Sequence, residues 1–322
     1  MKVFFGLPHS FRRPRPVVAI GVFDGVHTAH RRILAAAAAR AKEIKGTSVA
    51  LTFCPHPQGQ KSLYSLEHRL KLIAECGIDV CVVLDFSATL AGLSPEEFLR
   101  GIVAGKLKTR CVYVGGNFRF GRGASGNVRL LRSLGRRLGF EVRVFPRVRV
   151  GDSPVSSTLI RKYILSGRLA EAASLLGRPV SVYGTVIKGD RLGTRLGFPT
   201  ANIDPHHEVL PPAGIYSVKA FLDGREEIGG ICYIGTRPTL GEHRPEKRVE
   251  AHLFDIKSDL YGRNVLINFI SKVRNDRKFP SLEALKKQIA EDIGKARERR
   301  KMRNEVSPIF VADEAGERRR TN

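Results

Sequence analysis

The chain has 322 residues, more than one hydrophobic core usually organises, so we expect about two domains. Hydrophobic residues make up 42% of the sequence and charged residues 27%, which excludes a largely disordered chain. Lysine and arginine together number 55 against 31 aspartates and glutamates, a formal net charge of +24. This excess of positive charge predicts anionic partners, either phosphorylated small molecules or nucleic acid.

The sequence carries none of the usual signals for a membrane or an oxidising compartment. No apolar run approaches the roughly 20 residues that span a bilayer. The first 16 residues lack the continuous apolar segment of a signal peptide. The five cysteines are scattered and form no C-x-x-C pair, which is typical of reduced thiols. We therefore predict a cytoplasmic protein that does not bind membranes.

The first half alternates valine-rich apolar runs with helical patterns. This alternation is typical of a parallel sheet covered by helices on both faces, with a ligand crevice at the carboxyl ends of the strands. Helix capping is clearest at Ser94, which is followed by Pro95 and by Glu97 three residues on. The expected strands are 16–23, 46–53, 80–86 and 110–118, and the expected helices are 31–45, 66–76 and 94–107.

The second half begins with a helical pattern over 157–176 and then becomes rich in short strands. Such strands, separated by Gly and Pro without helices between them, predict a small antiparallel barrel. An amphipathic helix over 281–298 is expected to close it, and residues 307–322 are expected to be a mobile tail. The expected strands are 180–188, 214–222, 229–235, 248–254 and 264–273, and the expected apolar stripe of the helix is Leu282, Leu285, Ile289 and Ile293.

Two histidines, His27 and His30, lie at the start of the first helix, after an Asp24-Gly25 turn. With His56 they could hold a metal ion, but no fourth ligand completes a zinc set. A packing role is disfavoured because a polar turn at a strand end is expected to be exposed. A helix start offers unpaired N–H groups and partial positive charge, and Gly25 would let the backbone approach an anion. A phosphate site is the favoured interpretation.

The stretch "GVFDGVHTAH" is similar to the signature of the bacterial bifunctional riboflavin kinase/FAD synthetase family. The stretches "TFCPHP", "VGGNFRFGRGASGN", "VSSTLIRKYILSGRLAEAASLLGRP", "GDRLGTRLGFPTAN" and "RVEAHLF" follow the family pattern in order, over about residues 17–300. The resemblance implies an α/β nucleotidyltransferase with a Rossmann-like parallel sheet of the HxGH type. A small antiparallel β-barrel riboflavin kinase domain with a C-terminal helix is implied to follow. The implied boundaries are 1–178 for the FMN adenylyltransferase, 179–306 for the kinase and 307–322 for a basic tail.

The resemblance also implies the chemistry. Riboflavin and ATP would give FMN, and FMN and a second ATP would then give FAD and pyrophosphate, with Mg²⁺ as cofactor. In the first domain the resemblance assigns catalytic roles to His27 and His30, which would steady the pyrophosphate leaving group, and to Arg161, which would hold anionic phosphate oxygens. Residues implied to bind nucleotide or flavin there are Gly21, Phe23, Asp24, Gly25, His56, Asn117, Phe118, Ser156, Ser157 and Thr158.

Plainer interpretations exist for some of these residues. Ser156 or Ser157 would cap a helix in any case, and Phe118 and Phe120 could simply belong to a core.

In the kinase domain the resemblance assigns the role of general base to Glu250 and the binding of Mg²⁺ to Thr200 and Asn202. Taken alone, the glycine-rich stretch would indicate only turns, and Glu250 only a solvated strand face. Implied phosphate and flavin contacts are Gly189, Gly193, Gly197 and Arg274.

Strand alternation places Glu250 and His252 on one face and Val249 and Ala251 on the other.

Two departures from the family pattern leave alternatives open. Ala29 stands where the signature has glycine, and Gly116-Asn117 stand where acidic residues are common. One alternative is therefore a riboflavin kinase with a degraded adenylyltransferase half. A basic nucleic-acid-binding protein on this scaffold is disfavoured, because no nucleic-acid motif appears and no aromatic residues interleave with the basic stretch near the C-terminus. The sequence leaves the oligomeric state undetermined.

Overall fold

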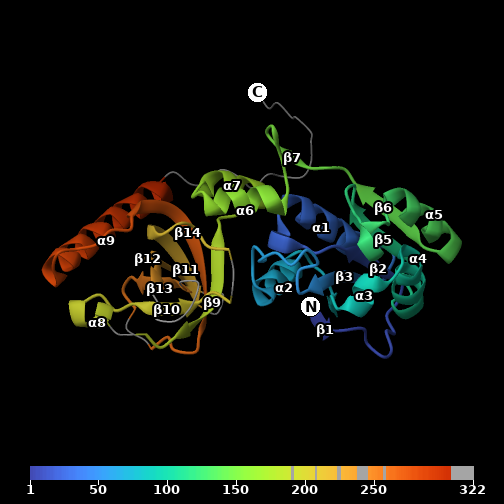
Figure 1. The fold of residues 1–322 in the computed structure, drawn as a ribbon, viewed down its shortest axis with the longest axis horizontal. Helices are drawn as coiled ribbons and strands as arrows, with labels where there is room; N and C mark the ends of the chain where they lie inside the picture. Colours follow the sequence, from blue (N-terminus) through green and yellow to red (C-terminus); the bar gives the residue numbers. More distant parts are fainter. Residues whose placement is uncertain (190–191, 207–208, 223–225, 238–245, 257–258, 306–322) are drawn as a thin grey trace, which may run out of the picture.

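The computed structural model describes residues 1–189, 192–206, 209–222, 226–237, 246–256 and 259–305. A parallel sheet with helices forms the N-terminal half, and a barrel with one long helix forms the C-terminal half (Figure 1). Two short helices lie at the junction between them. The implied fold class is confirmed.

The sheet of the N-terminal half has six strands in the order β1-β4-β3-β2-β5-β6, and every pairing is parallel. The four strands expected from valine-rich runs are all present. The two outermost strands, β1 and β6, were not predicted. The strands are β1 (Lys2–Phe5), β2 (Pro16–Ile20), β3 (Thr47–Cys54), β4 (Val80–Asp85), β5 (Cys111–Gly115) and β6 (Glu141–Phe145).

Helices cover both faces of this sheet. Residues of α1 and α2 pack in one core cluster, and residues of η2 and α5 pack in another. The predicted capping box at Ser94 is present, since its side chain accepts the N–H of Glu97 and the Glu97 carboxylate accepts the N–H of Ser94. The helices are α1 (Thr28–Glu43), α2 (Leu66–Glu75), α3 (Ala88–Gly92), α4 (Pro95–Glu97), the π-helix η2 (Phe98–Lys106) and α5 (Val128–Leu138), with short 3-10 turns η1 (Asp24–Val26) and η3 (Arg122–Ala124).

The junction consists of α6 (Ser157–Leu165) and α7 (Leu169–Leu176). A single helical stretch was expected here, but the helix breaks at Gly167, whose φ is +76°. Buried residues of both helices belong to one continuous core cluster that also includes α1 and the start of the barrel. The two halves therefore share part of their hydrophobic core. A two-residue ladder, β7 (Arg149–Val150) with β8 (Ser153–Pro154), precedes α6.

The C-terminal half is a closed antiparallel barrel in the order β10-β13-β12-β11-β14-β9. All five expected strands are present, and β10 adds a sixth. Helix α8 (Leu192–Leu196) lies between β9 and β10. The strands are β9 (Ser181–Ile187), β10 (Ala201–Asp204), β11 (Gly214–Leu222), β12 (Glu226–Arg237), β13 (Glu246–Leu253) and β14 (Asn264–Asn275).

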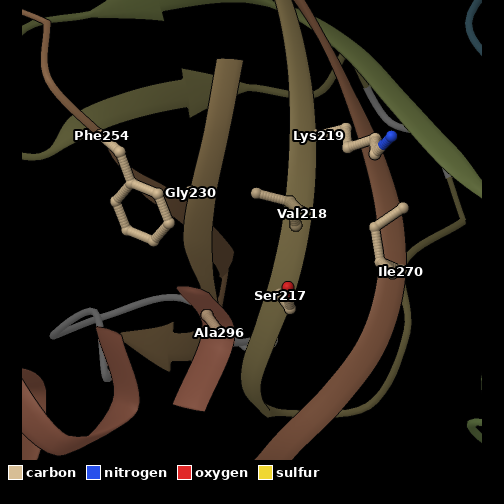
Figure 2. A pocket seen from close by; sticks show the side chains of 7 residues that line it. All are labelled: Ser217, Val218, Lys219, Gly230, Phe254, Ile270 and Ala296. Atoms are coloured by element: carbon tan, nitrogen blue, oxygen red, sulfur yellow. The ribbon is translucent and has the colours of Figure 1, made fainter. Parts of the chain in front are cut away.

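Helix α9 (Leu282–Glu305) packs on the outside of the barrel. The expected apolar stripe is partly wrong, because Leu282 is 57% exposed while Gln288, Asp292 and Ala296 are buried. Polar groups can occupy this face because arginines of the barrel side hydrogen-bond to Gln288 and Asp292. A small, mainly apolar pocket lies beneath the helix beside Ala296 (Figure 2). The expected tail, 307–322, lies outside the described residues.

Candidate active sites

The turn after β2 has an unusual backbone. Phe23, Gly25 and Val26 all have positive φ, at 52°, 79° and 38°. Such values are costly for side chains other than glycine, above all for a β-branched residue, and persist only where the surroundings hold them. A Cβ on Gly25 would lie 2.6 Å from Cδ1 of Leu63. Glycine is thus required at position 25 because φ is positive and because the backbone packs closely on Leu63. From the sequence, only the close approach of a ligand was expected to require it.

His27 is the N-cap of α1, and its Nδ1 accepts the N–H of His30 at 3.4 Å. The two rings are stacked with centroids 3.6 Å apart, and the edge of the Phe23 ring packs on His30. The expectation that the turn is exposed is wrong for His27, which is only 4% exposed. Burial lowers the pKa of His27 to about 3 and lowers the pKa of His30 well below its usual value. Both rings are therefore neutral near pH 7.

The metal alternative for these histidines finds no support. No cluster of three or more potential ligands with metal-binding geometry occurs among the described residues.

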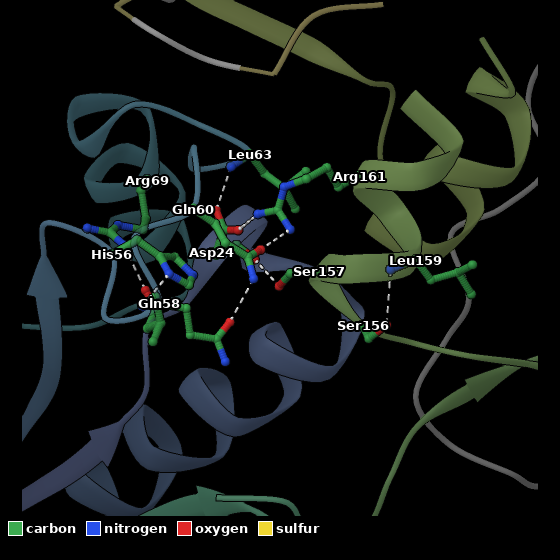
Figure 3. A network of polar contacts seen from close by, with 11 residues as sticks. Asp24, His56, Gln58, Gln60, Leu63, Arg69, Ser156, Ser157, Leu159 and Arg161 are labelled. Atoms are coloured by element: carbon green, nitrogen blue, oxygen red, sulfur yellow. Dashed lines mark hydrogen bonds and ion pairs between the residues drawn. The ribbon is translucent and has the colours of Figure 1, made fainter. Parts of the chain in front are cut away.

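Asp24 is buried and joins the turn to α6 and to the segment before α2 (Figure 3). Its Oδ1 accepts the N–H of Leu63 at 2.7 Å, and its Oδ2 pairs with the Arg161 guanidinium at 2.7 Å. Its backbone carbonyl accepts the Ser157 hydroxyl at 2.9 Å. Burial raises the pKa of Asp24, and the Leu63 hydrogen bond and the Arg161 charge oppose that rise. The carboxylate is committed to holding Arg161 and the turn.

The N-terminus of α6 thereby lies against the turn that leads into α1. Ser156 is the N-cap of α6 and accepts the N–H of Leu159 at 3.2 Å, so the capping interpretation is confirmed. Arg161 also donates to Oε1 of Gln60 at 2.9 Å, whereas Thr158 is exposed. Two helix N-termini near one guanidinium group form a setting that favours anions.

Two further arginines that the sequence did not single out lie at the same turn. Arg69, from α2, is 2% exposed and donates to the carbonyls of Val22 and Phe53 at 2.9 and 3.0 Å. Arg178 donates to the carbonyls of Gly25 and Val26. Isolated arginines in such positions look like solvated surface in a sequence, and only the tertiary structure reveals their burial.

Several buried polar atoms around this turn have no hydrogen-bond partner within the described protein. They are His30 Nδ1, Tyr64 Oη and the Nε atoms of Arg69, Arg161 and Arg178. Three guanidinium groups surround a single carboxylate here, so the site holds an excess of positive charge. Unpaired donors and excess charge suit a polyanionic ligand.

The other residues that the sequence predicted to bind nucleotide or flavin near this turn either lie beside Asp24 or support the turn. His56 lies near Asp24, and burial lowers the pKa of His56 (Figure 3). Gly21 and Phe23 are supporting residues, because Phe23 is buried and a Cβ on Gly21 would lie 3.0 Å from its ring. Neither is free to contact a ligand through a side chain.

The loop after β5 packs separately from the turn. Phe118 stacks on Phe120 with centroids 5.4 Å apart, and Phe120 is buried, so the core interpretation holds for Phe120. Asn117 is exposed. A Cβ on Gly116 would lie 3.2 Å from the carbonyl oxygen of Phe145, which explains why glycine suits this position. Among the described contacts, none joins Asn117 or Phe118 to the turn.

In the barrel, Asn202 on β10 is paired in register with Glu250 on β13. Directly opposite residues of antiparallel strands project on the same face. Val249 and Ala251 are buried in the barrel, and Glu250 lies on the other face, as strand alternation predicted. Arg248 donates to Oε1 of Glu250 at 3.0 Å.

The glycine-rich segment approaches the same two strands closely. A Cβ on Gly189 would lie 2.0 Å from Nδ2 of Asn202, and one on Gly193 would lie 2.9 Å from Oγ1 of Thr200. Gly197 has φ +89°, and residues 190–191 lie outside the described residues. The glycines are therefore more than turn residues, since two of them allow the backbone to pack on Asn202 and Thr200.

The Arg274 side chain lies between the barrel and α9. Its Nε lies 3.1 and 2.9 Å from the two carboxylate oxygens of Asp292, and its guanidinium lies over the ring of Phe279. The sequence did not reveal Asp292, because a polar residue on a helix is usually solvated.

Comparison with known proteins finds matches for both halves of the chain. A family model described as FAD synthetase matches residues 11–159, and one described as riboflavin kinase matches residues 176–299. The bifunctional riboflavin kinase/FMN adenylyltransferase of Escherichia coli K12 is 35% identical over 307 residues, covering 92% of this chain and 97% of that protein. The chain belongs to this family. The Bacillus subtilis member is 33% identical and covers 88% of this chain.

The two halves of this riboflavin kinase/FMN adenylyltransferase family member also occur together in a solved structure. A Streptococcus pneumoniae chain described as a macrolide-efflux protein has a TM-score of 0.78 at 26% identity, covering 91% of this chain and 97% of that one. Within the described residues, no helix has the length and apolar character needed to cross a membrane. The FAD synthetase match ends before Arg161, and the kinase match includes Arg178.

Proposed function

We propose that residues 1–178 transfer an adenylyl group from ATP to FMN and that residues 179–306 phosphorylate riboflavin. The observation that carries the first assignment is the excess of buried positive charge beside two helix N-termini. The pairing of Asn202 with Glu250 beneath close-packed glycines supports the second assignment.

In adenylyl transfer, a phosphate oxygen of FMN attacks the α-phosphorus of ATP, and the bond to pyrophosphate breaks. This chemistry requires alignment and stabilisation of negative charge more than a protein nucleophile. His27 and His30, being neutral, would each donate one N–H to phosphate oxygens. Arg161 would supply charge while Asp24 holds its guanidinium in place.

In the kinase reaction, the 5′-hydroxyl of riboflavin attacks the γ-phosphorus of ATP and ADP leaves. Glu250 would accept the hydroxyl proton, acting as the general base. The segment around Gly189 and Gly193 would line the ATP phosphates with backbone N–H groups.

Thr200 and Asn202 would hold Mg²⁺. Their neutral oxygens suit this ion, since phosphate oxygens and water complete its coordination. When bound, Mg²⁺ neutralises charge on the phosphates.

We also propose a cytoplasmic location for the enzyme. All five cysteines are free thiols, as expected in a reducing compartment.

The assignment is tested by incubating the full chain with riboflavin, ATP and Mg²⁺ and separating riboflavin, FMN and FAD. Glu250→Gln keeps the size of the side chain and removes the base, so FMN formation should fall by ~10²–10⁴-fold. FAD formation from supplied FMN should not change. Glu227→Gln is the matched control, because this β12 carboxylate pairs with Lys219 away from the Asn202 pairing. Near-normal FMN formation by Glu250→Gln would remove Glu250 from the mechanism.

A further inference from the structure

Arg178 stands between the last helix of the junction and the first strand of the barrel. Its guanidinium reaches back to the adenylyltransferase site, where Nη1 donates to the Val26 carbonyl at 2.9 Å and Nη2 donates to the Gly25 carbonyl. The group also lies over the ring of Tyr64, 5.3 Å from its centroid. A residue at the domain junction thus contacts the backbone directly before His27.

The carbonyls of this turn are held from several directions. That of Val22 accepts from Thr52 and Arg69, and that of Asp24 accepts from Ser157. The next two carbonyls, of Gly25 and Val26, accept from Arg178. The donors come from β3, α2, α6 and the junction, so no single element fixes the turn.

Arg178 holds the most strained part of the turn. Val26 is fully buried and has φ +38°, a conformation that a β-branched residue adopts only when its surroundings impose it. Removing the guanidinium would leave two carbonyls without these donors. The backbone could then relax, and such a change would redirect His27 and the first N–H groups of α1.

A second contact links the barrel side to the same site. The N–H of Val209, in the segment before β11, donates to the Leu63 carbonyl at 3.4 Å. The Leu63 N–H in turn donates to Asp24, which holds Arg161. The site is therefore contacted from the domain junction through Arg178 and from the C-terminal half through Val209.

We propose that Arg178 is a positioning residue for adenylyl transfer. It fixes the Gly25–Val26 backbone and thereby the orientation of the His27 side chain and of the first turn of α1. Because Arg178 directly precedes the barrel, the geometry of the adenylyltransferase site depends on the position of the kinase half. This inference rests on the proposed assignment of adenylyl transfer to residues 1–178.

The test compares Arg178→Met and Arg178→Lys with the parent protein, each as the full chain. A displacement of about 1 Å at a reacting group lowers a rate by about 10²-fold. We expect kcat for FAD formation from FMN to fall about 10²-fold in Arg178→Met, with KM for ATP changed less than threefold. Arg178→Lys should be intermediate, because an ammonium keeps the charge but cannot donate with the geometry of the guanidinium fork. FMN formation from riboflavin by the same preparations should stay within twofold.

Arg168→Met is the matched control. It removes the same charge ten residues away, at an exposed position where Arg168 pairs with Glu171. Both activities of this variant should stay within twofold of the parent.

Hydrogen exchange provides a readout that does not depend on activity. Amides of residues 21–30 should exchange faster in Arg178→Met, while those of β11 and β12 should not change. FAD formation within threefold of the parent, an equal loss of both activities, a rise in KM alone, or unchanged exchange at residues 21–30 would each overturn the positioning role. If the parent itself makes no FAD, the proposed function fails for this half, and the exchange experiment still decides on Arg178.

Discussion

His27 and His30 carry no charge in the folded protein near pH 7, because burial lowers the pKa of both. They can donate hydrogen bonds to an anion, but the positive charge of the site comes from Arg69, Arg161 and Arg178. Histidines in this turn therefore serve as neutral donors beside charged groups, of which Arg69 and Arg178 are held by backbone carbonyls and Arg161 by Asp24 and Gln60.

The lowered histidine pKa predicts how stability depends on pH. The folded-state pKa of His27 is about 3, below the usual histidine pKa of 6.5. As pH falls below 6.5, the unfolded chain takes up a proton that the folded chain does not, so stability is lost toward acid. The loss should approach about 1.4 kcal/mol per pH unit for each such histidine.

Thermal unfolding of the parent and His27→Gln at pH 7.5, 6 and 5 checks this prediction. The variant should be less stable at every pH, since the cap is altered, but its melting temperature should depend less on pH. Equal pH dependence of the two proteins would contradict the lowered pKa.

Ala29 stands in the first turn of α1, between the two histidines. If its methyl group crowds the nucleotide, overpacking would cost ~1–3 kcal/mol in the bound state. We expect Ala29→Gly to raise FAD formation by about tenfold and to leave FMN formation unchanged. The glycine also weakens the helix by up to ~1 kcal/mol, so melting temperature is measured together with the two rates. An unchanged or lower rate of FAD formation would show that the pocket accommodates the methyl group.

At the scale of elements, the kinase site depends on close contact between the glycine-rich segment and β10. Gly189→Ala would introduce a Cβ 2.0 Å from Asn202 and must displace that side chain or the segment. We expect FMN formation to fall at least tenfold and FAD formation from FMN to persist. Gly294→Ala in α9 is the control, because nothing lies within 4 Å of its Cβ position. A normal rate of FMN formation by Gly189→Ala would mean that Asn202 is not held by this contact.

The elements that the sequence predicted well are those whose pattern is local. Valine-rich central strands and the Ser94 capping box depend on neighbouring residues and were found. The edge strands β1 and β6 are only partly buried and carry charge, so their patterns are weak. The buried face of α9 was missed because Asp292 is satisfied by Arg274, a partner distant in sequence.

The candidate site residues also divide into those that local motifs predict and those that contact the site only in the folded structure. The resemblance to the family predicts roles for His27, Asp24 and Arg161, since each lies within one of the short stretches that carry it. Arg69 lies outside these stretches. Arg178 lies at the end of one, but like Arg69 it meets the turn only through tertiary contacts.

At the scale of the whole molecule, the two halves are distinct in topology but continuous in their core. Buried residues of α6 and α7 pack in the cluster that includes Val180 and Val182 of the barrel side. Separating the halves would therefore expose apolar surface on both.

We expect the fragments 1–178 and 179–322 to fold, the second to keep FMN formation and the first to form FAD more slowly than the full chain, because the barrel no longer fixes Arg178 and the Leu63 carbonyl. Each should melt below the full chain, because the shared part of the cluster is lost. Activity assays and thermal melts of the two purified fragments check this. If neither fragment folds, the boundary near 178 or the assignment of a sufficient core to each half is wrong.

The closed barrel and the open sheet also differ in how readily each half of the protein self-associates at high concentration or on heating. A closed barrel pairs its strands all round, whereas among the described residues the sheet ends in β1 and β6, each paired with another strand on one side only. β1 carries Phe5, which is 74% exposed, and a single charge at Lys2, while β6 carries two charges, at Glu141 and Arg143. Unpaired edges template aggregation, and charge on an edge resists it. Self-association of the partly opened protein should therefore start at β1, which makes this short strand the place where solubility is most easily engineered.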